Sequence, residues 1–321
     1  MAKFLFIVCL LFILLFILAG CVSEHVDFYE PEIEIEIPNE IPDTNDWEEI
    51  VFPLRRERGI LEVYVFGLSS ADSILITTEN YVVMIDTGER QHGHDIVEAL
   101  FSRGIFHIDH LIITHFDRDH VGGAYDIIRF LGVRNIIVPN YHRESNSANR
   151  FREAKHRVGI EAYVLTDTIS FVLDDATFEI VPSGLAFFIF GNEEDDADET
   201  DEDIFIPREN DFSILVNVTH GNNSFLFTGD AMAGRLGEFL EQDEISQVDF
   251  LKLPHHGRHN RRTVEFLNAI KPRYAVSTCC HERPIDQRVV AVLENFGTEI
   301  FLSIHGGVSA RSDGYVLVVS Q

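Results

Sequence analysis

Cysteine is scarce in this sequence, and its four copies cannot form a disulfide framework. Cys9 lies within an apolar N-terminal run, and Cys21 lies at the end of that run. Cys279 and Cys280 are adjacent, and a disulfide between neighbouring residues is strained. The fold must therefore depend on a buried apolar core and not on disulfide bonds.

Basic residues are also few, with 25 Lys and Arg against 53 Asp and Glu and a formal net charge of −28. Residues 22–50 contain eleven acidic side chains and residues 193–203 contain nine, with no Lys or Arg in either segment. We interpret 21–55 as a Pro-containing tether. We interpret 191–203 as a solvated loop, with metal buffering or substrate gating as its alternative. The remaining body is mildly acidic, which counts against tight nonspecific DNA binding.

Several catalytic motifs are absent. The sequence has no Gly-x-Ser-x-Gly stretch and no cysteine arrangement that would supply a nucleophile. It also has no phosphate-binding loop and no dinucleotide fingerprint. These absences count against serine or cysteine hydrolases and against nucleotide-dependent enzymes.

Beyond its N-terminus, the sequence has no apolar run long enough to span a membrane. Residues 4–19 are nearly all apolar and lead into Leu18-Ala-Gly-Cys21. We interpret 1–20 as a signal peptide that resembles those of bacterial lipoproteins, which leaves Cys21 lipidated; an uncleaved signal anchor is the alternative. Either interpretation predicts an extracytoplasmic domain that is anchored to a bacterial membrane.

The most informative run is 114–123, which reads Thr-His-Phe-Asp-Arg-Asp-His-Val-Gly-Gly and follows the apolar segment 110–114. Four metal-competent side chains lie on this one turn: His115, Asp117, Asp119 and His120. Imidazole and carboxylate groups suit zinc, manganese or iron. Gly122 and Gly123 are expected to let the backbone turn tightly into the next helix. The alternative is a polar turn in which Asp119 only caps that helix.

Three other segments also place a polar residue after a predicted buried strand: Asp86-Thr-Gly88 after 81–85, Thr228-Gly-Asp230 after 224–227, and Pro254-His-His-Gly257 after 249–253. Open α/β sheets place their sites where strand ends meet at one edge, so the repetition predicts that these residues converge. Two cations held there, about 3.5–4 Å apart, would convert water to hydroxide and stabilise charge on an attacked phosphorus or carbonyl carbon. Hydrolysis is the expected reaction class.

This order of motifs resembles the metallo-β-lactamase-fold hydrolases. The stretches 61–76, 210–216 and 251–257 are most similar to the hydrolase domain of ComEC-type competence proteins and its stand-alone relatives. The resemblance implies an α/β fold over 56–321, a four-layer αββα sandwich with the metals at one edge. Helices are predicted near 93–103, 121–131, 145–158, 261–270 and 286–296, and a strand is predicted to begin at Phe212.

The resemblance also implies two divalent metal ions, zinc or manganese. The implied ligand set places one ion on His115 and Asp117, the other on Asp119, His120 and His256, and Asp230 as a bridge between them. Asp119 and Asp230 would position the hydroxide and assist proton movement, which makes them the expected catalytic residues. Many superfamily members have His where Asp117 stands, and its oxygen ligand favours harder ions such as Mn²⁺.

Further candidates for supporting the ligands or contacting substrate are Asp86, Asn210, His255, Arg258 and His281. Asp86 is expected to orient ligand loops through hydrogen bonds, and His255 is equally consistent with a structural histidine. The extra histidine ligand of the superfamily is missing, and Asn210-Asp211 occupies its stretch, so the first metal would be held more weakly. The loop Gly67-Leu-Ser-Ser-Ala71 replaces the family's Gly-Gln-Gly and leaves the substrate open.

Two basic clusters lie near these motifs: Arg143, Arg150, Arg152, Lys155 and Arg157, and Arg258, Arg261 and Arg262. We interpret the first as an ordinary solvated helix face, while phosphate binding and a solvated face are equal alternatives for the second. The main functional prediction is a membrane-tethered phosphodiesterase with nuclease-like activity on a small or polymeric phosphodiester, DNA included. The alternatives are hydrolysis of a lactam, lactone or thioester, and a non-catalytic binding or DNA-uptake component.

Overall fold

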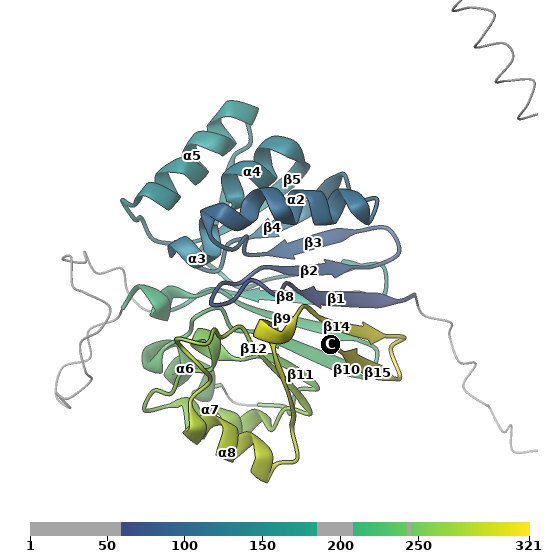
Figure 1. Cartoon of the computed structure of the whole chain (residues 1–321), viewed down its shortest axis with the longest axis vertical. Helices are drawn as coiled ribbons and strands as arrows, with labels where there is room; N and C mark the ends of the chain where they lie inside the picture. Colours follow the sequence, from purple (N-terminus) through teal and green to yellow (C-terminus); the bar gives the residue numbers. More distant parts are fainter. Residues whose placement is uncertain (1–58, 185–207, 243–244) are drawn as a thin grey trace, which may run out of the picture. The chain divides into compact units, whose positions relative to one another are not determined.

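Two β-sheets lie at the centre of the fold (Figure 1). The computed structural model describes residues 59–184, 208–242 and 245–321, all within the compact unit Arg56–Gln321. The first sheet has the order β15 (Leu317–Ser320), β14 (Val308–Ser312), β1 (Leu61–Val65), β2 (Ile74–Thr77), β3 (Val82–Ile85), β4 (His107–Ile112), β5 (Gly132–Pro139) and β6 (Ala162–Leu165). The second has the order β13 (Glu299–Leu302), β12 (Tyr274–Ser277), β11 (Phe250–Lys252), β10 (Asn223–Phe227), β9 (Leu215–His220), β8 (Ala176–Val181) and β7 (Ile169–Leu173).

Helices cover the outer face of each sheet (Figure 1). Those associated with the first sheet are η1 (Arg90–His92), α2 (Gly93–Ser102), α3 (Arg118–Val121), α4 (Ala124–Phe130) and α5 (Asn146–Val158). The remaining helices are η2 (Glu209–Phe212), α6 (Ala233–Leu240), η3 (Pro254–Gly257), α7 (Thr263–Ile270), α8 (Gln287–Asn295) and η4 (Ser303–His305). The predicted α/β class and its αββα layering are confirmed.

Apolar side chains that alternate along the strands build the core between the sheets. On β1, Leu61, Val63 and Val65 are buried between the sheets, whereas Glu62 points to solvent. Phe178 of β8 occupies the same core from the second sheet. An alternation of period two buries one face of a strand, so these residues hold the two sheets together without polar contacts.

The helices contribute two further cores with a helical period. Ile96, Val97 and Leu100 of α2 pack against the outer face of the first sheet, and Phe266 and Ile270 of α7 do the same on the second. Spacings of three and four residues place such side chains on one helix face. The helices are thereby fixed over the sheets, and the loops that leave the strand ends inherit defined positions.

The strand predicted to begin at Phe212 begins later. Residues Glu209–Phe212 form the 3₁₀ helix η2, and β9 starts only at Leu215. The Asp211 carboxylate accepts a hydrogen bond from the Arg208 backbone N–H at 3.0 Å, which satisfies the start of the helical turn. Phe212 packs into the helix-side core of the first sheet and not into a strand pair. Glu209, on the same turn, accepts a hydrogen bond from Tyr141, which itself contacts the metal-motif loop, residues 114–123.

Gly122 and Gly123 serve a different purpose from the predicted tight turn. Their φ angles are −61° and −80°, which any residue adopts. A Cβ on Gly123 would lie 2.2 Å from the Thr87 carbonyl oxygen, and one on Gly122 would lie 2.6 Å from the Arg90 backbone nitrogen. The two glycines therefore allow the backbone after α3 to approach the loop after β3, a steric requirement and not a conformational one.

Candidate metal centre

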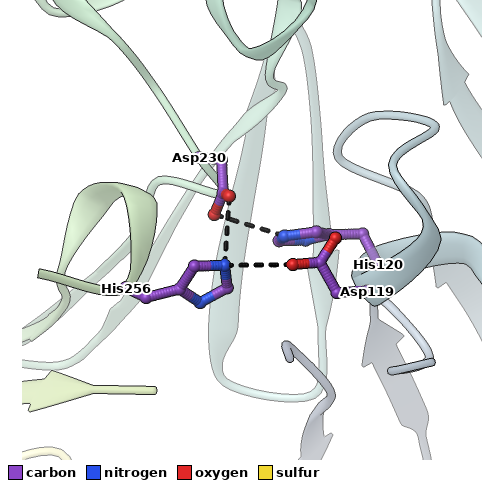
Figure 2. A group of neighbouring side chains, drawn as sticks. All are labelled: Asp119, His120, Asp230 and His256. Carbon is purple, nitrogen blue, oxygen red and sulfur yellow. Dashed lines mark ion pairs between the residues drawn. The ribbon is translucent and has the colours of Figure 1, made fainter. Parts of the chain in front are cut away.

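Segments that follow three different strands bring four side chains together (Figure 2). Asp119 and His120 lie on α3, which follows β4 of the first sheet. Asp230 follows β10 and His256 lies on η3 after β11, both in the second sheet. The group therefore joins the two sheets at the edge where these strands end, as expected for strand ends that converge.

The distances within this group are those of potential metal ligands. His120 Nε2 lies 3.2 Å from Asp230 Oδ1, and His256 Nε2 lies 3.1 Å from Asp230 Oδ2. His256 Nε2 also lies 3.4 Å from Asp119 Oδ2 (Figure 2). The four ligand atoms all lie within 4.8 Å of one another. Two nitrogens and carboxylate oxygens in this arrangement suit zinc and other first-row divalent ions.

Hydrogen bonds orient both histidines so that Nε2 faces the group. His120 Nδ1 lies 2.8 Å from Asp86 Oδ2 and donates to it. The Thr278 hydroxyl donates to Asp72 Oδ1 at 2.6 Å, so it accepts from His256 Nδ1 at 2.9 Å. Both Nε2 atoms, and Asp230 Oδ1, are buried and lack a hydrogen-bond partner among the described residues. Histidine metal ligands are held in this way, so these residues fit a divalent ion.

His115 and Asp117 form a separate pair beside this group. His115 Nε2 lies 3.4 Å from Asp117 Oδ2. The centroid of the His115 ring lies 4.0 Å from that of the His120 ring, and the two ring planes are tilted relative to each other. The Thr114 hydroxyl donates to Asp86 at 2.7 Å and accepts from His115 Nδ1 at 3.1 Å. His115 Nε2 is buried and has no hydrogen-bond partner among the described residues. The pair thus offers a second cation position, although its atoms are outside the four-residue group.

The backbone at these strand ends is sharply turned. Asp86, His255 and His256 have φ angles of 57°, 47° and 57°, in the left-handed region that side chains other than glycine rarely adopt. Gly257, next to them, has a φ of 89°. Such strain is concentrated at functional sites, where surrounding contacts impose it. Here it directs Asp86 to the Thr114 amide at 2.8 Å and aims His256 at the metal group.

A buried ion pair next to the metal group escaped the sequence analysis. Lys252, fully buried in β11, forms an ion pair with Asp72, lies 3.5 Å from Asp230 Oδ1 and donates to the Gly229 carbonyl at 2.9 Å. Asp72 in turn accepts from Thr278, which supports His256. A lone lysine inside the apolar run 250–253 was the available signal, because buried charges are rare unless paired.

The carboxylates control the protonation of the histidines. Burial lowers the pKa of His120 and of His256, but the neighbouring carboxylates, led by Asp230, raise each pKa well above its ordinary value. Burial raises the pKa of Asp230, but the charges of His256 and His120 bring it well below the ordinary carboxyl value. A negative field that attracts a proton to Nε2 also attracts a divalent cation, so the two compete.

The other candidates lie at different distances from the group. His255 Nε2 is 3.9 Å from Asp230 Oδ2 and accepts from Arg258 Nη1 at 3.3 Å. Burial lowers the pKa of His255 to about 4, so this imidazole is neutral near pH 7. Asn210 lies on η2, and His281 is exposed on the turn after β12; neither belongs to the four-residue group.

The first basic cluster is not simply a solvated helix face. Arg143 precedes α5 and contacts the carboxylates of Asp117 and Glu209. Arg157 does behave as predicted, since it is exposed and pairs with Glu153 along α5. Arg143 was misassigned because its partners are 26 and 66 residues away in the sequence.

The N-terminal assignments lie outside the described residues. These are the signal peptide 1–20, lipidation of Cys21 and the tether 21–55, and the acidic loop 191–203 lies outside them as well. Within the parts that are described, no helix is both long and apolar enough to cross a membrane. Of the cysteines described, Cys279 and Cys280 are both free thiols.

Comparisons with known proteins agree on one family. Residues 66–281 match the family model of the Metallo-beta-lactamase superfamily. ComE operon protein 3 of Bacillus subtilis (strain 168) is 23% identical over 244 residues, which are 70% of this chain and 29% of that protein. Competence protein ComA of Neisseria gonorrhoeae is 28% identical over 226 residues, 67% of this chain and 26% of that protein.

The chain spans less than a third of the length of these curated relatives. Among solved structures, the metallo-beta-lactamase fold protein YhfI from Bacillus subtilis covers 79% of this chain and 100% of its own, with 11% identity and a TM-score of 0.52. At that identity the likeness concerns the fold, and it agrees with the two sheets and flanking helices described above.

Proposed function

The chain belongs to the metallo-β-lactamase superfamily, and from this premise we propose that it is a metal-dependent hydrolase of phosphodiesters, tethered outside the cytoplasm to a bacterial membrane. The observation that carries the proposal is the orientation of two buried imidazoles, whose Nε2 atoms face Asp119 and Asp230 and have no hydrogen-bond partner among the described residues. Two imidazole nitrogens and two carboxylates that converge in this way fit a bound divalent cation.

His120, His256, Asp119 and Asp230 would hold one divalent ion, and His115 and Asp117 a second. Zinc or manganese bound there would supply a hydroxide nucleophile near neutral pH and offset charge on the reacting group. Asp230 lies within 3.2 Å of both imidazoles and fixes their relative position. Asp119 is the most exposed of the four, with 22% of its side chain accessible, so its carboxylate is placed to accept a proton from water.

Charge beside the metal group favours an anionic substrate. Arg258 adjoins neutral His255, and His255 adjoins Asp230, so a guanidinium lies at the rim of the site. A guanidinium is well suited to phosphate oxygens because it presents several donors in a plane. Phosphate binding, left open for the cluster of Arg258, Arg261 and Arg262, is therefore proposed for Arg258.

The relatives support a nucleic-acid phosphodiester as substrate. Two are the proteins described above, and Recombination protein 2 of Haemophilus influenzae is a third, 23% identical over 210 residues. The names of the second and third refer to competence and to recombination. The location is proposed on the apolar run 4–19 and Cys21, which would carry the lipid anchor.

Hydrolysis of a generic phosphodiester by the purified full chain, in mild detergent and with added Mn²⁺ or Zn²⁺, tests the proposal. We expect turnover that requires metal and falls by about 10² or more in Asp230→Asn, because the carboxylate between the two imidazoles is lost. The matched control is Asp167→Asn, an exposed aspartate after β6, which should retain full activity. DNA, RNA and cell-wall phosphodiesters would then be compared as substrates.

Two other results would contradict the phosphodiesterase. Turnover of a lactam, lactone or thioester with no phosphodiester activity would assign the same site to a carbonyl substrate. Metal binding without turnover of either class would favour a binding or DNA-uptake component.

A further inference from the structure

The side chain of Arg143 contacts one carboxylate oxygen of Asp117 at the proposed His115–Asp117 metal position. Arg143 lies between β5 and α5, and its Nη1 atom contacts both Asp117 Oδ1 and Glu209 Oε2. Two carboxylates from distant segments thus share one guanidinium nitrogen. The other oxygen of Asp117 lies 3.4 Å from His115 Nε2. A positive charge therefore already sits at the edge of the His115–Asp117 pair.

A chain of hydrogen bonds holds this arrangement in place. The Tyr141 hydroxyl donates to Glu209 Oε1 at 2.6 Å and accepts from the Phe116 backbone N–H at 2.6 Å. Phe116 lies between the proposed ligands His115 and Asp117 in the sequence. The contacts therefore lead from Phe116 to Tyr141, then to Glu209 and Arg143, and return to Asp117. Glu209 is thereby fixed on both oxygens, and the guanidinium it holds is positioned against Asp117.

The cluster of Asp117, Glu209 and His115 is stabilised by a nearby positive charge. The side chains of Asp117 and Glu209 are only 18% and 19% exposed, and that of His115 is fully buried. Two carboxylates this close in a poorly solvated place repel each other unless a positive charge lies between them. The buried Nε2 of His115 has no hydrogen-bond partner among the described residues, and its Nδ1 is used by Thr114.

The basic side chain beside the Asp119, His120, Asp230 and His256 group is held more firmly than Arg143. Lys252 lies 3.5 Å from Asp230 Oδ1, but it is fully buried and held by Asp72 and by the Gly229 carbonyl. Arg143, in contrast, has 32% of its side chain exposed and can rotate into solvent. A long side chain that reaches the surface can exchange its partner, whereas a buried lysine within a strand cannot.

We propose that Arg143 is a competing internal cation, whose positive charge on Asp117 opposes the binding of a divalent ion at His115 and Asp117. This inference rests on the proposed metal centre and adds an order of filling to it. The Asp119, His120, Asp230 and His256 position fills first, and the His115 and Asp117 position fills at higher metal concentration. The second ion therefore binds against the guanidinium, so metal supply sets whether one ion or two are present.

Zinc binding by the full chain, stripped with chelator and titrated in detergent, tests this order without reference to activity. Bound zinc is measured against buffered free Zn²⁺ for the wild type and for Arg143→Met, which removes the charge and keeps the bulk. We expect two unequal affinities in the wild type. Arg143→Met should raise the weaker affinity by about tenfold or more and leave the tighter one unchanged, because the competitor is lost.

Three variants make the result specific. Arg157→Met, an exposed arginine of α5 paired with Glu153, should bind zinc like the wild type. Combining Arg143→Met with Asp117→Asn should abolish the gain, because the freed carboxylate is gone. Arg143→Gln, which removes the charge and keeps a polar amide, gives the same comparison if the Met variant fails to fold.

An unchanged or reduced weaker affinity in the folded Arg143 variants, with the tighter site still filled, overturns the inference alone. A wild-type chain that binds no zinc at either position overturns the metal centre as well, so the two failures are distinguishable.

Discussion

Each of the three histidines at the candidate metal centre uses its two ring nitrogens in the same way. Nδ1 donates to an oxygen of the protein, namely Asp86 for His120, Thr278 for His256 and Thr114 for His115. Nε2 is left without a hydrogen-bond partner among the described residues. Because one oxygen fixes each ring, the Nε2 atoms are oriented before any cation arrives, which reduces the entropy cost of binding.

Protonation of these rings predicts how metal binding depends on pH. His120 and His256 have pKa values raised well above 6.5, with burial opposing the shift and Asp230 leading the carboxylates that cause it. Each imidazole must lose its Nε2 proton to bind metal. The affinity should therefore rise with pH across the range below those raised pKa values, by about tenfold per unit for each proton displaced.

Zinc titration by calorimetry at several pH values, in buffers that differ in ionisation enthalpy, counts the protons released. Release of one to two protons, with weaker binding at pH 6 than at pH 8, is the expected result. An affinity independent of pH and of buffer would show that both imidazoles are already neutral, contrary to the pKa shifts.

At the scale of elements, the sequence predicted the parts of the site that are local in the chain. The His115 to His120 run and Asp86 follow directly after apolar strands, so both their spacing and their convergence were predictable. Asp72 and Thr278 touch across 206 positions, and Arg143 reaches Glu209 across 66. The residues next to these four in the sequence do not indicate such partners, because the contacts form only when the two sheets and their loops are assembled.

The short helix α3 depends on close backbone packing, which gives a prediction for Gly123→Ala. The added Cβ would lie 2.2 Å from the Thr87 carbonyl oxygen, so the backbone at Gly123 and the adjoining helix α3, which carries Asp119 and His120, must shift. We expect a loss of about 1–3 kcal/mol in the free energy of unfolding, together with weaker zinc binding.

Gly237→Ala is the matched control. Gly237 lies on α6, where an added Cβ has no heavy atom within 4 Å, so the change should be neutral or stabilising by up to about 1 kcal/mol. Urea unfolding and zinc titration of both variants check the pair. Unaltered zinc binding in Gly123→Ala would show that the loop adapts without moving its ligands.

For the whole molecule, the alternation of apolar strands with helices predicted the α/β class, whereas the layered arrangement was predicted from the family resemblance. The runs that form β1, β4 and β11 were recognised as strands. The edge strand β7 was not, although its run Ile-Ser-Phe-Val-Leu is apolar; it pairs with β8, and Val172 on it is 62% exposed. The strand order also escaped prediction, since β1 pairs with β14 across about 250 positions.

The proposed metal would also act on the whole fold, because its ligands come from both sheets. Asp119 and His120 follow β4, whereas Asp230 and His256 follow β10 and β11. An ion bound by all four would crosslink the sheets at one edge and add to the apolar core between them. At a free metal concentration 100 times the dissociation constant, linkage contributes about 2.7 kcal/mol to the stability of the folded state.

Thermal unfolding with saturating zinc and with chelator measures this contribution. The expected increase in Tm is roughly 5–10 °C for a domain of this size. Asp230→Asn should lose most of the increase, because the carboxylate between the two imidazoles is gone, whereas Asp167→Asn should keep it. An equal Tm with and without zinc, while dialysis shows zinc bound, would mean that the ion is held by one sheet only. The geometry of Asp230, within 3.2 Å of His120 from the opposite sheet, argues against that outcome.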